Sequence, residues 1–131
     1  MAAASFVGLS PWPSDDSPRI ELETPTGLID LHNNANLVSV GISVDPAELV
    51  LSFSHAHDWR EIDPSKVNVR LVFSGVQALR VAQDADYDPR AGDTLEGIVH
   101  RVISGRSEFE IDAGDWFFEF YATQVAIDME R

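Results

Sequence analysis

Apolar and polar residues alternate along much of the chain, which is the pattern of β-strands that bury one face. The first long run has four apolar residues on one face and three small ones on the other: Val38, Val40, Ile42 and Val44 against Ser39, Gly41 and Ser43. Residues 45–48 contain Pro46 and are typical of a turn. The alternation resumes with Leu49, Leu51 and Phe53, so the sequence predicts a β-hairpin here.

The same alternation predicts several more strands. They cover residues 19–23, 67–73, 76–82, 109–111, 116–120 and 125–129, and Gly75 interrupts the chain between the second and the third of these. Residues 95–103 fit either a strand or a helix, and we favour a strand. Residues 28–36 are the most helix-like stretch, and we predict one short helix there.

Short strands at spacings near ten residues are typical of an antiparallel sheet that folds over itself. We therefore predict a mainly β fold (α+β at most): an antiparallel β-sandwich or a partly open barrel of about seven or eight strands, with one short helix. The length of 131 residues suits one domain, which we assign to residues 19–131. Residues 1–18 include a proline- and serine-rich stretch, and we expect an extended N-terminal arm whose Trp12 either docks on the body or stays loose.

The charge and composition of the chain exclude some classes of function and disfavour others. Nine basic residues against 22 acidic ones give a formal net charge of −13, which disfavours binding to nucleic acid. The chain has no cysteine, so disulfides, thiol nucleophiles and cysteine-bound zinc are excluded. The sequence has no apolar run long enough for a transmembrane helix or a signal peptide, so we expect a cytoplasmic protein that does not bind membranes.

One short segment has the composition of a metal site. His55, His57 and Asp58 place two imidazoles and a carboxylate within four residues, and these groups are common ligands of divalent metals. His32 or His100 is a candidate for a further ligand. The alternative is a solvated loop whose histidines only cap backbone groups. A divalent metal is the one cofactor that the sequence suggests.

Two groups of side chains are candidates for contact with a protein partner. The first is an acidic loop formed by Asp84, Asp86, Asp88 and Asp93. The second is one face of the last strands, where three acids and two aromatic residues alternate with the apolar core positions: Glu108, Glu110, Phe117, Glu119 and Tyr121. We expect this face to be exposed, with its aromatic residues forming an apolar patch rimmed by acids.

Three segments together resemble a known group of proteins. They are Leu31-His32-Asn33-Asn34-Ala35 leading into the first hairpin, Phe73-Ser74-Gly75-Val76 at the end of a strand, and the closing strand pair between residues 109 and 128. This arrangement resembles small bacterial β-rich domains of unknown function, some of which resemble immunity proteins of polymorphic toxin systems. Asn33 occupies the position where members often have aspartate. The resemblance covers residues 28–129, favours an interaction protein and gives no catalytic residues to carry over.

Two functions follow from these observations. The first is a non-enzymatic acidic protein, monomeric or homodimeric, that binds a basic protein partner such as a toxin domain. The second is a small metal-binding module or metal-dependent enzyme that uses His55, His57 and Asp58. A barrel that binds a small ligand in its interior is a third alternative, for which the sequence identifies no ligand.

Overall fold

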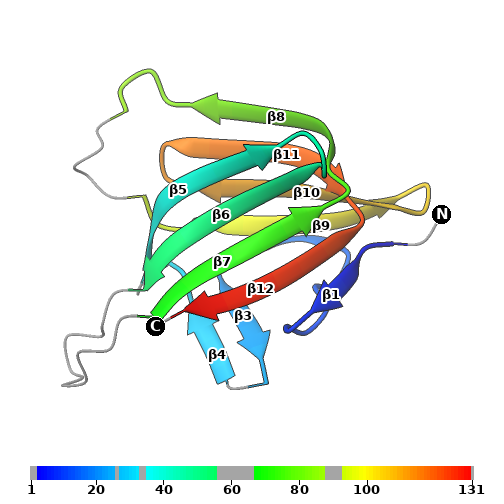
Figure 1. Ribbon diagram of the computed structural model, residues 1–131, viewed down its shortest axis with the longest axis horizontal. Coiled ribbons are helices and arrows are strands. Elements are labelled where there is room, and N and C mark those ends of the chain that lie inside the picture. The colour runs from blue at the N-terminus through cyan, green and yellow to red at the C-terminus, as the bar shows by residue number, and fades with distance from the viewer. Residues whose placement is uncertain (1–2, 26, 33–34, 56–66, 88–92, 131) are drawn as a thin grey trace.

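The computed structural model describes residues 3–25, 27–32, 35–55, 67–87 and 93–130 (Figure 1). Within this part of the chain the regular structure is entirely β, with twelve strands and no helix. The strands are β1 (Ser5–Val7), β2 (Asp15–Arg19), β3 (Glu21–Thr24), β4 (Gly27–Asp30), β5 (Ala35–Ser43), β6 (Glu48–His55), β7 (Val67–Ser74), β8 (Gln77–Gln83), β9 (Gly97–Ile103), β10 (Arg106–Ala113), β11 (Trp116–Ala122) and β12 (Gln124–Glu130). No segment of the described chain is a helix that could cross a membrane.

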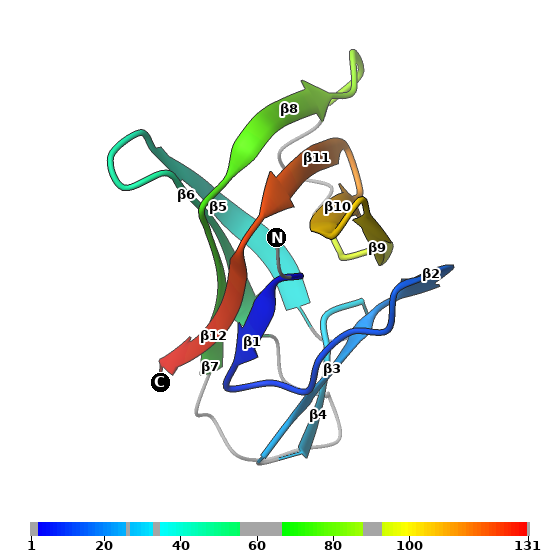
Figure 2. The ribbon, with the colours of Figure 1, turned by 90° about the vertical axis from the view of Figure 1, so that its right-hand side faces the viewer.

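Two five-stranded sheets form two layers, seen edge-on in Figure 2. The first sheet has the order β1-β12-β7-β6-β5, and the second has the order β2-β9-β10-β11-β8. Strands β3 and β4 form a separate two-stranded ribbon. All pairs are antiparallel except β1 with β12, which is parallel. Neither sheet closes into a barrel.

The core lies between the inner faces of the two sheets. Phe73 of the first sheet contacts Phe109 and Phe120 of the second, with ring centroids 5.5 and 4.8 Å apart. All three rings are at most 1% exposed. Burial of each such side chain contributes roughly 1.5–3 kcal/mol. The alternation in β7, β10 and β11 therefore fixes which residues of these strands face outward.

Two of the connections between the sheets lie next to one another. Gly75 and Val76 join β7 to β8, and Thr123 joins β11 to β12. Gly75 has a φ of +67°, and a Cβ at this position would collide with the side chain of Thr123. A glycine is required here because the conformation is left-handed and the space is occupied.

The N-terminal segment is part of both sheets. Strand β1 pairs with β12, and β2 pairs with β9. Between them Trp12 is 4% exposed and packs edge-on against Phe6 and Phe109, with centroids 5.2 and 5.8 Å away. Of the two alternatives for Trp12, the structure shows the docked one.

The all-β class is confirmed, but the short helix and the count of seven or eight strands are wrong. Residues 28–30 belong to β4, Leu31 and His32 form a turn, and residues 35–36 begin β5, while residues 33–34 lie outside the described chain. In that turn Asp30 Oδ1 accepts a hydrogen bond from the His32 amide at 2.9 Å, and the amide of Leu31 bonds to the Ile20 carbonyl oxygen. The backbone amides of this segment therefore bond to Asp30 and Ile20 and do not form the hydrogen bonds of a helix.

The additional strands are short and lack alternation. Strand β2 has the sequence Asp-Asp-Ser-Pro-Arg, which contains no apolar alternation to detect. The predicted strand over 19–23 is divided between β2 and β3, which belong to different sheets. The predicted hairpin is β5–β6, but a bulge between Leu37 and Ser39 shifts its register. Leu37, not Val38, therefore shares the inner face with Val40.

Candidate interaction surface

The outer face of the second sheet gathers most of the predicted contact residues. We call it the acidic face and define it by six side chains on β10 and β11: Glu108, Glu110, Asp112, Phe117, Glu119 and Tyr121. Their sequence neighbours point into the core and are buried, as Phe109 and Phe118 illustrate. The period-2 alternation of the two strands is what turns the six outward.

Antiparallel pairing sets the order of side chains across this face. Glu108 lies opposite Tyr121, Glu110 opposite Glu119, and Asp112 opposite Phe117. Side chains directly opposite one another are close neighbours, about 4.5–5.5 Å apart at Cβ, and like charges in this position are destabilising. Both acids of the pair Glu110 and Glu119 nevertheless have a cationic neighbour, because Glu110 accepts a hydrogen bond from Arg101 and Glu119 also lies opposite Arg80 of β8.

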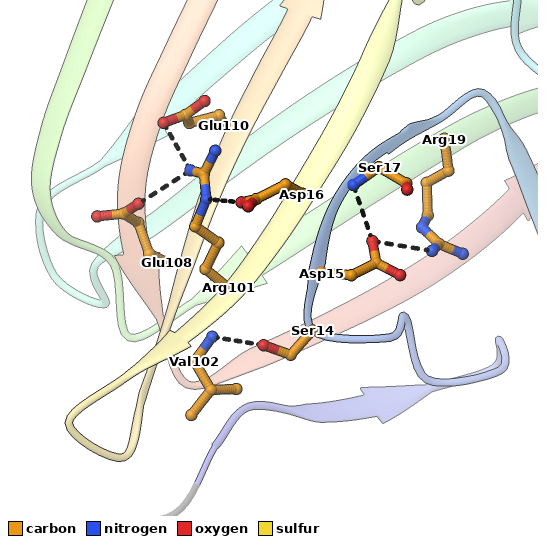
Figure 3. A network of polar contacts seen from close by, with 9 residues as sticks. All are labelled: Ser14, Asp15, Asp16, Ser17, Arg19, Arg101, Val102, Glu108 and Glu110. Carbon is orange, nitrogen blue, oxygen red and sulfur yellow. Dashed lines mark hydrogen bonds and ion pairs between the residues drawn. The ribbon is translucent and has the colours of Figure 1, made fainter.

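Arg101 on β9 neutralises one border of the acidic face (Figure 3). Its Nε donates to Asp16 Oδ1 at 2.6 Å, and its Nη1 donates to Glu110 Oε1 at 2.8 Å and to Glu108 Oε1 at 3.4 Å. The hydrogen bonds to Asp16 and then to Glu110 raise the pKa of the Arg101 guanidinium above its ordinary value. Arg101 therefore remains charged and connects β2, β9 and β10.

A second arginine covers the aromatic side chain at the other end. The guanidinium carbon of Arg106 lies 4.1 Å from the centroid of the Tyr121 ring, a cation–π contact. Arg106 Nη2 also donates to Gln77 Oε1 at 2.6 Å. One side of Tyr121 is thus occupied, which leaves Phe117 as the aromatic residue with an uncovered ring.

Asp112 and Phe117 separate two hollows at the end of the acidic face. One hollow, of about 200 Å³, is lined by residues that include Glu96, Glu110, Asp112 and Phe117. The other, of about 290 Å³, adds Asp84 and further residues of the β10–β11 turn to Asp112 and Phe117. Phe117 is 37% exposed between them.

The carboxyl group of Asp112 lies in an unfavourable electrostatic environment. Partial desolvation, and then the negative charges of Glu96 and Asp84, raise the pKa of Asp112 above its ordinary value. Within the described chain, no basic side chain forms an ion pair with Asp112. The carboxylate of Asp112 is therefore available to a cation from outside the molecule.

The predicted acidic loop is only partly available for contact. Asp84 and Asp86 are exposed in the turn after β8, and Asp84 borders the hollow beside Phe117. Asp93 is 6% exposed, and its Oδ1 accepts a hydrogen bond from the Asp115 amide at 3.1 Å. Asp93 is therefore a structural residue and not a contact residue. Asp88 lies outside the described residues.

The predicted metal loop also falls largely outside the described chain. His57 and Asp58 are not described, and His55 is known only as the last residue of β6. Among the described residues no three histidines, aspartates or glutamates are grouped to hold a metal ion. Metal binding by His55, His57 and Asp58 stays a prediction.

The two other histidines have structural partners. His100 is 4% exposed, with Nδ1 at 3.0 Å from the Trp12 carbonyl oxygen and Nε2 at 2.8 Å from Ser107 Oγ. His32 Nδ1 lies 2.9 Å from the carbonyl oxygen of Leu95. Since both nitrogens of His100 are engaged, His100 is not the further metal ligand that the sequence suggested.

The sequence did not identify two residues of this surface, Asp112 and Arg101, as candidates for partner contact. Asp112 continues the alternation of Glu108 and Glu110, so the pattern contained the signal for it. Arg101 has no such signal, because its contacts depend on the register of three strands. Comparison with protein-family models, with curated proteins and with solved structures finds no match to this chain.

Proposed function

We propose that the protein is a non-enzymatic binding protein whose acidic face docks a basic protein partner. The observation that carries the proposal is the arrangement at Asp112 and Phe117. There, the carboxylate of Asp112, which has no ion-pair partner among the described residues, lies beside an exposed aromatic ring and two hollows that can receive side chains. Exposed aromatic residues next to charges are the usual anchors of protein interfaces.

The energetics of the free protein support this proposal. Asp112 is partly desolvated beside other carboxylates, and Glu110 faces Glu119 across the strand pair. The environment of Asp112 destabilises the unbound chain, whereas the charge of Glu110 is compensated by Arg101. A lysine or arginine from a partner would offset the repulsion between Asp112 and its neighbouring carboxylates. Relief of this repulsion would contribute to the free energy of binding.

The overall charge supports the same conclusion. A net charge of −13 attracts basic proteins over long distances and accelerates their association. The resemblance to small bacterial β-rich domains, some of which resemble immunity proteins of polymorphic toxin systems, suggests the class of partner. We infer a basic toxin domain, such as a nuclease, in a bacterial cytoplasm.

A titration with hexa-arginine, monitored by NMR, tests whether the acidic face is the preferred site for cations. We expect the backbone amide shifts of residues 110–119 to change most, and the affinity to fall steeply as salt rises. Shifts spread evenly over the molecule would contradict a site on this face. Salt-independent binding would contradict an electrostatic one.

A further inference from the structure

The two sheets leave four edge strands, and three of them are protected against pairing with another chain. Strand β1 has only three residues. Strand β2 contains two aspartates, an arginine and Pro18, which has no amide hydrogen to donate. Strand β8 contains Arg80 and a bulge near Ala78, whose φ is +54°. Short length, charge, proline and bulges are the usual means by which proteins block sheet edges.

Strand β5 lacks this protection. Residues 35–44 contain no charged residue and no proline, in a chain where 24% of residues are charged. The bulge lies at the start of β5, and the Leu37 amide there bonds to the Asp93 carbonyl oxygen at 2.7 Å. From Ser39 to Ser43 the strand pairs regularly with β6 on one side. No other described strand pairs with its opposite side.

The apolar side chains of β5 are also incompletely covered. The pairing with β6 directs Val40 and Ile42 toward the inner face of the first sheet, because they lie opposite the buried Leu51 and Leu49. Ile42 is nevertheless 58% exposed, and Val44 just beyond the strand is 90% exposed. The outer face of the same stretch carries only small residues: Ser39, Gly41 and Ser43.

We propose that β5 pairs in antiparallel fashion with β5 of a second copy of this chain, centred on Gly41. In this register Gly41 lies opposite Gly41, and Val40 lies opposite Ile42 of the second copy. Ser39 then lies opposite Ser43, so within the regular part of the strand apolar residues meet apolar ones and small residues meet small ones. The two first sheets would become one continuous ten-stranded sheet related by a two-fold axis.

Charge selects a second copy as the occupant. Two chains that each carry −13 repel one another, so a self-interface requires a surface without acids. The stretch 35–44 is such a surface, and a basic partner would gain no ion pair from it. The dimer would leave both acidic faces free, since these lie on the outer side of the second sheet.

The first test is the oligomeric state, measured by size-exclusion chromatography with light scattering. We expect the wild-type chain to have twice the 14.5 kDa mass of one copy. Ile42→Lys places a charge in the shared apolar row and should weaken the dimer by ~10-fold or more. Val7→Lys is the control, because Val7 is 50% exposed on β1, the opposite edge of the same sheet.

The absence of cysteine permits a test of the register. Gly41→Cys fits the fold, because a Cβ at Gly41 lies 3.8 Å from its nearest neighbour. Strands paired about Gly41 bring the two Cα atoms to a distance that a disulfide can span, so mild oxidation should crosslink the two copies. Val7→Cys should not crosslink.

A monomeric wild-type chain, or equal weakening by Ile42→Lys and Val7→Lys, would overturn the proposed dimer. Absence of the Gly41→Cys crosslink in a dimeric protein would overturn the register centred on Gly41. Neither result bears on cation binding at Asp112, which is measured separately with hexa-arginine. Far-UV circular dichroism verifies that each variant is folded.

Discussion

At the scale of single residues, Asp112 illustrates a conflict between stability and binding. Its pKa is raised, so the folded state holds the proton more tightly than the unfolded state does. The stabilisation is therefore complete below the ordinary aspartate pKa of about 4 and is lost as the pH rises through the folded-state value. At neutral pH the charged carboxylate destabilises the fold.

Asp112→Asn should therefore raise the melting temperature at pH 7 by about 1–2 °C, a small effect because Asp112 is exposed to solvent. At pH 3, where aspartate is neutral in both states, the difference should vanish. Glu23→Gln on the β3–β4 ribbon makes the same change in net charge and serves as the control. Thermal melts at both pH values measure the effect, and a lower melting temperature for Asp112→Asn at pH 7 would contradict it.

His100 carries a second pH dependence, of opposite sign. Burial lowers its pKa, while the hydrogen bond with the Trp12 carbonyl oxygen opposes the shift and the charge of Arg19 adds to it. Because a carbonyl oxygen can only accept, Nδ1 carries the proton of the neutral ring and Nε2 accepts from Ser107. Ser107 Oγ in turn accepts from the Ala4 amide at 2.8 Å, so the neutral ring helps to hold the N-terminal segment.

Stability from His100 is complete above pH 6.5 and falls as the pH drops toward the lowered folded-state pKa, by at most about 1.4 kcal/mol per pH unit. His100→Asn keeps a donor near the Trp12 carbonyl oxygen but does not titrate. Urea denaturation between pH 5 and pH 7.5 should show a shallower pH dependence in this variant. An unchanged slope would show that His100 does not contribute to it.

At the scale of elements, the sheet-to-sheet connection at Gly75 is the most constrained point. Gly75→Ala forces a side chain into a left-handed conformation and against Thr123. We expect a loss of about 1–3 kcal/mol in the free energy of unfolding. Gly41→Ala, where the added methyl group makes an ordinary contact with Val50, should change stability little. Chemical denaturation compares the two, and equal losses would contradict the argument.

The strands that the sequence predicts well are those whose alternation reflects burial on one face. In β7, β10 and β11 the buried positions are apolar apart from Ser107, so the period identifies the strand. Strands β1 and β2 form by pairing with β12 and β9, and their own residues give little indication of it. The helix predicted over 28–36 failed because Leu31 is buried by tertiary contacts that local propensity does not represent.

The candidate site likewise has features that the sequence predicts and features that it does not. Glu110, Phe117 and Glu119 share a face because alternation places them there, and the sequence predicts this. The burial of Asp93 depends on the Asp115 amide, and the contacts of Arg101 depend on Asp16, which is 85 residues away along the chain. Such contacts require the strand order, which the pattern of a single chain does not determine.

At the scale of the whole molecule, charge and fold assign different roles to different surfaces. The outer face of the second sheet concentrates carboxylates around Phe117, whereas β5 at the edge of the first sheet is uncharged. A dimer formed through β5 would present two acidic faces, and two linked sites bind a multivalent basic partner more tightly than one site does.

The central claim is that the acidic face binds basic partners through Asp112 and Phe117. The most direct measurement compares the affinity for hexa-arginine of wild type, Asp112→Asn and Glu23→Gln by calorimetry at low salt. The two variants change the net charge equally, so general attraction predicts equal losses. We predict at least ~5-fold weaker binding for Asp112→Asn and little change for Glu23→Gln. Equal affinities for the two variants would contradict a site at Asp112.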